Sequence, residues 1–266
     1  MDIEKFLAAP DERPLDRIAD DGGFCGIFRM IGCIGDSLSS GEFESLDKEG
    51  KKHYHDLYEY SWGQYIARMI GSKVYNFSRG GMTAHEYWNK CSIEKDFWNP
   101  DKLCQAYIIA LGATDIVNNR TPAVGSMDDI NLEDYNKNGE SFVGYYARII
   151  QKLKEMQPRA KFFLVTLADS AGLYGSKETV DMHAELLYGI AEKFDNTYVL
   201  DIRKYGPVYD RAFRDKFYLG GHMNPMGYMF TAKMIASYID YIIRHNMRDF
   251  AEVGFIGTEL TNFGEK

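Results

Sequence analysis

Short runs of apolar residues recur along the chain. They occupy residues 28–35, 73–77, 106–112, 161–168 and 197–202. Each run is rich in Ile, Val, Tyr or Phe, which is typical of strands that are buried on both faces. The pattern therefore predicts strands that belong to a parallel sheet.

Between these runs, apolar residues recur with the period of a helix. The stripes cover residues 62–69, 142–156, 180–194 and 228–242. Gly71 follows the first stripe and can end that helix in a left-handed conformation. Asn224 and Pro225 precede the last stripe and suit the N-cap and the first helical position.

Strands that alternate with helices indicate βαβ units. Because such crossovers are right-handed, we expect an α/β fold: a doubly wound parallel sheet inside a three-layer α/β/α sandwich. Two polar or aromatic segments, 39–58 and 85–103, look like insertions, and the tail after about residue 248 has no clear period. We expect one domain over residues 1–266.

Composition and charge narrow the possible classes of protein. The net charge of −8 argues against a nucleic-acid or anionic-membrane surface. No stretch approaches 18 uninterrupted apolar residues, and the acidic N-terminus lacks a signal-peptide pattern. The four cysteines contain no C-x-x-C pair, so we expect buried free thiols and a cytoplasmic protein.

Residues that could take part in catalysis lie where the predicted strands end. Ser37 follows the first strand, "SRGGMT" (78–83) the second and "GATD" (112–115) the third, while "GGHMNPMGY" (220–228) precedes the last helix. Ligands of open parallel sheets bind at the carboxyl ends of the strands. A nucleophilic serine needs a base, usually His, and N–H donors for the oxyanion. A purely structural alternative is that Ser37 only caps the helix that follows it.

The order of these segments resembles the GDSL/SGNH hydrolase family over about residues 28–243. The matching residues are Gly35-Asp36-Ser37-Leu38, then Asn76, Gly81 and Thr83, then Gly112 to Asp115, and finally His222. The resemblance implies a flavodoxin-like fold and ester hydrolysis through an acyl-serine. It implies that Ser37 is the nucleophile and His222 the general base. The N–H groups of Ser37 and Gly81 would then be oxyanion donors.

Two positions depart from the family pattern. Thr114 stands where the family has an Asn that donates to the oxyanion, a role a threonine hydroxyl can also fill. Leu219 stands where the family has an Asp that orients the histidine. A backbone carbonyl could orient His222 instead, or a nearby acid such as Asp215 or Asp210 could reach it. The sequence thus indicates a Ser–His dyad or a degraded site.

Several other residues have a structural interpretation beside a functional one. We expect Asp36 and Asp115 to hold loop backbone, and Arg79 could contact a ligand or simply be solvated. The aromatic residues of the second insertion could stack on a sugar, although packing onto the domain is favoured: Trp88, Phe97 and Trp98. His53 and His55 have H-x-H spacing, but we expect a polar loop rather than a metal site.

Together these patterns predict a serine esterase that cleaves a small O-acyl ester, such as a carbohydrate O-acetyl group. The alternatives are a catalytically impaired binding protein that keeps the fold, and an O-acyltransferase. Retention of both Ser37 and His222 favours the esterase. We expect no metal or cofactor, and no nucleic-acid or membrane partner. The sequence leaves a homo-oligomer open.

Overall fold

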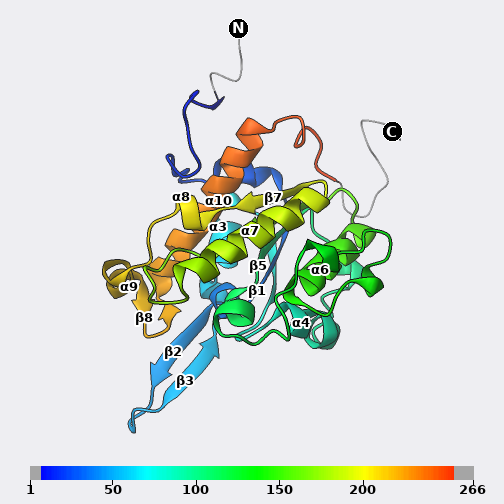
Figure 1. The fold of residues 1–266 in the computed structure, drawn as a ribbon. Helices are drawn as coiled ribbons and strands as arrows, with labels where there is room; N and C mark the ends of the chain where they lie inside the picture. The colour runs from blue at the N-terminus through cyan, green and yellow to red at the C-terminus, as the bar shows by residue number, and fades with distance from the viewer. Residues whose placement is uncertain (1–6, 255–266) are drawn as a thin grey trace.

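The computed structural model describes residues 7–254 and contains a five-stranded parallel sheet (Figure 1). Its strands are β1 (Met30–Gly35), β4 (Lys73–Ser78), β5 (Ala106–Ala110), β6 (Lys161–Val165) and β7 (Thr197–Leu200). The order across the sheet is β4-β1-β5-β6-β7, and each neighbouring pair is parallel. Every predicted strand is present, and β1 lies inside the sheet with β4 and β5 on either side.

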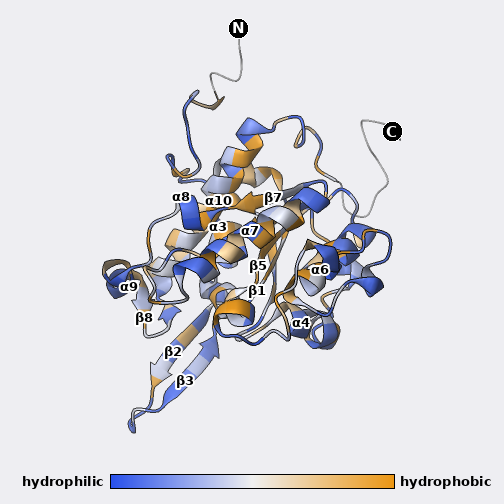
Figure 2. Cartoon of the chain, viewed as in Figure 1, coloured by the Kyte–Doolittle hydropathy of each residue, from blue (hydrophilic) through white to orange (hydrophobic). Residues whose placement is uncertain are grey.

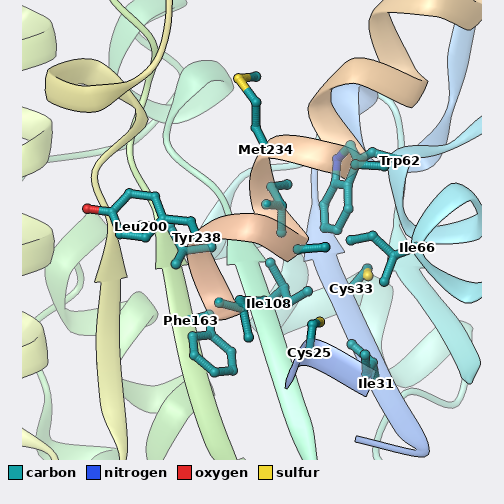
Figure 3. Close-up of a cluster of buried hydrophobic side chains, with 14 of the residues drawn as sticks. Cys25, Ile31, Cys33, Trp62, Ile66, Ile108, Phe163, Leu200, Met234 and Tyr238 are labelled. Atoms are coloured by element: carbon teal, nitrogen blue, oxygen red, sulfur yellow. The ribbon is translucent and has the colours of Figure 1, made fainter. Parts of the chain in front are cut away.

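Helices cover both faces of the sheet, so the expected three layers are confirmed. One face packs against α3 (Trp62–Ile70) and α10 (Pro225–His245), and the other against α6 (Phe142–Met156) and α7 (Lys177–Lys193). Alternate residues of β5 point to opposite layers: Ile108 joins the α3 and α10 side (Figure 3), whereas Ile109 joins the α6 and α7 side.

Local capping explains where the long helices begin and end. Gly71 takes a left-handed conformation, with φ of 66°, directly after α3, which few residues other than glycine adopt without strain. The Asn224 side chain accepts a hydrogen bond from the Gly227 N–H at the start of α10. Both caps match the sequence prediction.

The first insertion, residues 39–58, is not an irregular polar loop. It forms an antiparallel hairpin of β2 (Glu42–Leu46) and β3 (Lys52–Asp56), which projects from the body of the protein (Figure 1). The expectation of a polar loop around His53 and His55 is therefore wrong, because the alternating residues of the two strands pair across a short turn. The hairpin is largely hydrophilic, in contrast to the strands of the sheet (Figure 2).

The second insertion packs onto the α6 side of the molecule, as favoured from the sequence. Phe97 is buried and contacts Phe77 and Tyr87, while Trp88 and Trp98 pack edge to face with a ring separation of 5.7 Å. These aromatic rings belong to the packing of the domain rather than to an open sugar platform.

The remaining short elements complete the chain. They are α2 (Ser37–Ser40), α4 (Ala84–Glu86), α5 (Ser92–Glu94), α8 (Ile202–Tyr205), α9 (Arg211–Phe217), β8 (Tyr218–Leu219) and β9 (His222–Met223). All four cysteines are free and buried, as expected. Most of the tail after residue 248 lies outside the described residues. Within residues 7–254, no helix has the length and apolar character needed to cross a membrane.

Candidate active site

Ser37 is the first residue of a short helix that begins where β1 ends. Asp36 caps this helix, because its carboxylate accepts the Leu38 N–H at 3.2 Å. The first N–H groups of a helix have no intrahelical acceptor, so the Ser37 N–H is available to a ligand. Asp36 is buried, which raises the pKa of its carboxyl group. The predicted backbone role of Asp36 is confirmed.

Gly81 lies in the loop that follows β4, the strand beside β1. Its φ of 68° is in the left-handed region, and Arg120 Nη1 donates to its carbonyl oxygen at 3.0 Å. Asp115 accepts the Ala84 N–H at 2.9 Å, which ties this loop to the segment after β5. The predicted backbone role of Asp115 is therefore also confirmed. Together these bonds connect the loop that contains Gly81 to the segment after β5.

Thr114 lies beside Ser37 but its hydroxyl already has a partner. The Thr114 Oγ1 donates to Asp36 Oδ2 at 3.1 Å, and the residue is buried. In this arrangement the hydroxyl proton is directed at the carboxylate and not at a reacting oxygen. An oxyanion role for Thr114 stays a prediction, and it would require the hydroxyl to rotate away from Asp36.

His222 lies between two glutamates of the hairpin. Its Nδ1 is 2.9 Å from Glu44 Oε1, and its Nε2 is 3.9 Å from Glu42 Oε1. The ring also packs edge to face against Tyr54, with centroids 5.8 Å apart. The β2–β3 hairpin therefore fixes the imidazole through one hydrogen bond, one nearby charge and one aromatic contact.

Glu44 is held in place by three donors. Its side chain is only 8% exposed, and it accepts hydrogen bonds from His222, the Gly221 N–H at 2.7 Å and Lys52 Nζ at 2.9 Å. Burial alone would raise the pKa of Glu44, but the hydrogen bonds from Lys52, His222 and Gly221 outweigh it and hold the pKa below its usual value. Glu44 is therefore an ionised acceptor for the imidazole.

The close approach of Glu44 depends on two glycines before His222. A Cβ built on Gly220 or on Gly221 would lie 2.4 Å from a Glu44 carboxylate oxygen. Gly220 also has a left-handed φ of 69°. The sequence "GGH" therefore lets the loop pass beside the hairpin carboxylate.

Neither of the two acids that could have reached His222 is its partner in the structure. Asp215 is exposed on α9, and Asp210 caps the start of that helix by accepting the Phe213 N–H. Leu219, at the position where an Asp was missing, is 55% exposed. Glu44 takes the place of both candidates. The sequence did not reveal it, although the alternation in "GEFESL" and "KHYHD" could have indicated a hairpin beside the serine.

Ser37 and His222, which are far apart in sequence, line one open cavity of about 670 Å³. Gly81, Thr114 and Glu42 line the same cavity. The structure thus brings together Ser37, Gly81, Thr114 and His222, but not Asp215 or Asp210. The arrangement offers a hydroxyl, an imidazole with a fixed Nδ1 partner, and free backbone N–H groups.

Other residues singled out in the sequence have partners of their own. Arg79 lies 3.8 Å from the Glu86 carboxylate, and His53 and His55 pair with Asp47 and Ser45 within the hairpin. Over residues 7–254 no group of three or more His, Cys, Asp or Glu side chains is arranged to hold a metal ion.

Comparison with known proteins supports the family resemblance that the sequence motifs indicated. A sequence model of the GDSL-like lipase/acylhydrolase family matches residues 33–230. A search of curated proteins finds no match.

Among solved structures, a family two carbohydrate esterase from Clostridium thermocellum, in complex with cellohexaose, is similar with a TM-score of 0.54 and 15% identity. The alignment covers 91% of this chain and 67% of that one. A carbohydrate esterase family 2 enzyme from Corynascus thermopiles (Myceliophthora fergusii) aligns with a TM-score of 0.54 and 14% identity, over 81% of this chain and 66% of that one. A protein from Lactobacillus plantarum aligns with a TM-score of 0.57 and 13% identity, over 80% and 97%. At such identities the likeness shows a shared fold.

Proposed function

Because the chain belongs to the GDSL-like lipase/acylhydrolase family, we propose that it is a serine esterase whose nucleophile is Ser37 and whose base is His222. The observation that carries the proposal is that both side chains line one cavity while a buried carboxylate holds the Nδ1 of His222. A binding protein would need neither the base nor its acidic partner.

In the proposed reaction the Ser37 Oγ attacks the ester carbonyl carbon and transfers its proton to His222 Nε2. The imidazolium then gives that proton to the departing alcohol, which leaves an acyl group on Ser37. A water molecule, deprotonated by the same nitrogen, hydrolyses this ester and restores the serine. Glu44 keeps the Nδ1 proton in place, so that Nε2 is the free acceptor, and it stabilises the imidazolium.

The tetrahedral intermediate needs donors for its oxyanion. The N–H of Ser37, at the start of α2, and the N–H of Gly81 are the two that we assign to it. The structure supports this choice through the bonds that orient the two loops: Asp36 caps the serine turn, and Arg120 holds the Gly81 carbonyl. Thr114 would be a third donor after rotation of its hydroxyl.

We infer that the substrate is a small O-acyl ester of a saccharide, with a carbohydrate O-acetyl group as the simplest case. The large cavity presents charged and polar groups that suit hydroxyl-rich ligands: Glu42, Asp56, Asn118, Arg120 and Arg214. Two of the structural neighbours are carbohydrate esterases, which supports the same substrate class.

Labelling with a fluorophosphonate probe and turnover of p-nitrophenyl acetate test the proposal. Wild-type protein should be labelled at Ser37 and should release p-nitrophenol. The Ser37→Ala variant should do neither, whereas the matched control Ser45→Ala, on the exposed part of the hairpin, should do both. Turnover that survives in Ser37→Ala, or its absence from the wild type at every pH, would overturn the serine-esterase assignment. Product analysis with a sugar acceptor present separates hydrolysis from acyl transfer.

A further inference from the structure

A second, smaller cavity of about 120 Å³ lies against the proposed active site. Its walls come from the ends of two central strands, from the loop after β6, from α10, and from α9 and β8. Representative lining residues are Ala110, Val165, Ala168, Met234 and Tyr218. Most of these side chains are apolar, in contrast to the charged walls of the larger cavity.

The two cavities border each other at the serine turn, where they share part of their walls. Six residues line both of them: Asp36, Leu38, Ala113, Tyr174, Arg214 and Tyr218. Asp36 and Leu38 are the immediate neighbours of Ser37 in the chain. The smaller cavity therefore borders the place where Ser37 would attack an ester carbonyl carbon.

Several polar groups in the wall of the small cavity are hydrogen-bonded within the protein itself. Asp36 accepts from Thr114 and Leu38, Thr166 bonds to the Arg203 N–H, and Ser170 bonds to Tyr174. Among the fully buried side-chain atoms of the described lining residues, the Ser39 Oγ alone lacks a hydrogen-bond partner. A mostly apolar wall with few unsatisfied buried polar atoms favours an apolar occupant.

We propose that this cavity is the acyl pocket and that it takes an unbranched aliphatic chain of up to about five carbons, since a cavity of similar size holds a benzene molecule. This inference rests on the proposed function. It assigns the two sides of the scissile ester to two cavities: the alcohol, a saccharide, lies in the charged cavity, and the acyl chain lies in the apolar one.

Chain-length dependence follows from the burial of methylene groups. Each methylene transferred from water to an apolar site improves binding by about fourfold. For p-nitrophenyl esters, which share one alcohol, we expect kcat/KM to rise by at least about tenfold from acetate to butanoate and pentanoate. It should then fall for octanoate, whose chain exceeds the cavity.

The variant Ala168→Leu places three extra carbons in the cavity wall. It should remove the preference for butanoate over acetate. Ala110→Val, which fills the cavity from β5, is a second variant that should also reduce the preference for butanoate. Ala212→Leu, on the exposed face of α9, is the matched control and should keep the wild-type profile.

Two outcomes would overturn the assignment. A wild type that hydrolyses acetate, but gains nothing from longer chains, would show that the cavity receives no acyl group. If Ala168→Leu and Ala110→Val lower kcat/KM equally for all esters, the cavity has a packing role alone. If no ester is turned over and no probe labels Ser37, the proposed function fails as well. That result is distinguishable, because the first two outcomes require a working Ser37.

Discussion

Ser37, Gly81 and Thr114 lie at the carboxyl ends of three adjacent parallel strands, whereas Glu42 and Glu44 lie on a hairpin outside that sheet (Figure 1). The residues at the sheet edge are placed by a buried β scaffold. The two glutamates are placed by a mostly exposed ribbon that lies against β9. The contrast teaches that the nucleophile and the orientation of its base are set by independent parts of the fold.

This division explains how the chain can dispense with an acid at position 219. Leu219 pairs directly with His222 across the β8–β9 ladder, but its side chain is exposed and carries no charge. Glu44 reaches the same imidazole from the hairpin, through the space that Gly220 and Gly221 leave open. The hairpin thus supplies the carboxylate that the loop before α10 lacks.

The largest expected effect is on the sheet side of the comparison. Ser37→Ala removes the attacking oxygen, so kcat should fall by about 10⁴-fold or more, which leaves only what binding and the oxyanion donors provide. Steady-state hydrolysis of p-nitrophenyl butanoate measures this loss of kcat. A loss smaller than about tenfold would mean that another group attacks the ester.

Removing the hairpin acid should have the next largest effect. Glu44→Gln keeps the size of the side chain but loses the charge that stabilises the imidazolium, and its amide can favour the wrong tautomer. We expect kcat to fall by about 10²- to 10⁴-fold with KM changed little. A variant whose loss lies mainly in KM would indicate that Glu44 binds substrate rather than positioning His222.

Glu42 should matter less than Glu44. Its Oε1 is 3.9 Å from His222 Nε2, too far for a hydrogen bond, and burial raises the pKa of its carboxyl group. Glu42→Gln should therefore slow hydrolysis by about tenfold at most, through loss of a nearby charge. If Glu42→Gln is as damaging as Glu44→Gln, the two glutamates share the role that we give to Glu44 alone.

The carboxyl group of Asp115, which lies at the edge of the sheet, should make the free energy of unfolding depend on pH. Burial raises the pKa of Asp115 to about 7, with a smaller contribution from the charge of Asp36. Between about pH 4 and pH 7 the folded protein keeps a proton that the unfolded chain has lost, so the free energy of unfolding decreases as pH rises through this range.

Asp115→Asn cannot lose this proton and should lack that decrease. Its stability relative to the wild type should improve by a few kcal/mol from pH 4 to pH 7, since one pKa unit is worth about 1.4 kcal/mol. Urea unfolding at several pH values measures the difference. Parallel curves for the two proteins would show that Asp115 is already ionised at pH 4 in the folded state.

The sheet side of the site could be predicted from sequence because each part has a local cause. Strand periodicity, the Gly71 and Asn224 caps and the placement of ligands at strand ends all depend on neighbouring residues. Glu44 could not be identified in this way, because its role depends on how β2 pairs with β3 and where the hairpin then lies. The hydrogen bond from Thr114 to Asp36 was missed for a similar reason: it joins loops from two different strands.

The most direct test of the account asks whether an acid at position 219 can replace the hairpin acid. We compare kcat/KM for p-nitrophenyl butanoate in the wild type, Glu44→Gln, Leu219→Asp and the double variant. We expect a loss of at least about 100-fold in Glu44→Gln, little change in Leu219→Asp, and recovery of at least about tenfold in the double variant. Glu44→Gln activity within twofold of the wild type would contradict it, because His222 would then need no acid from the hairpin.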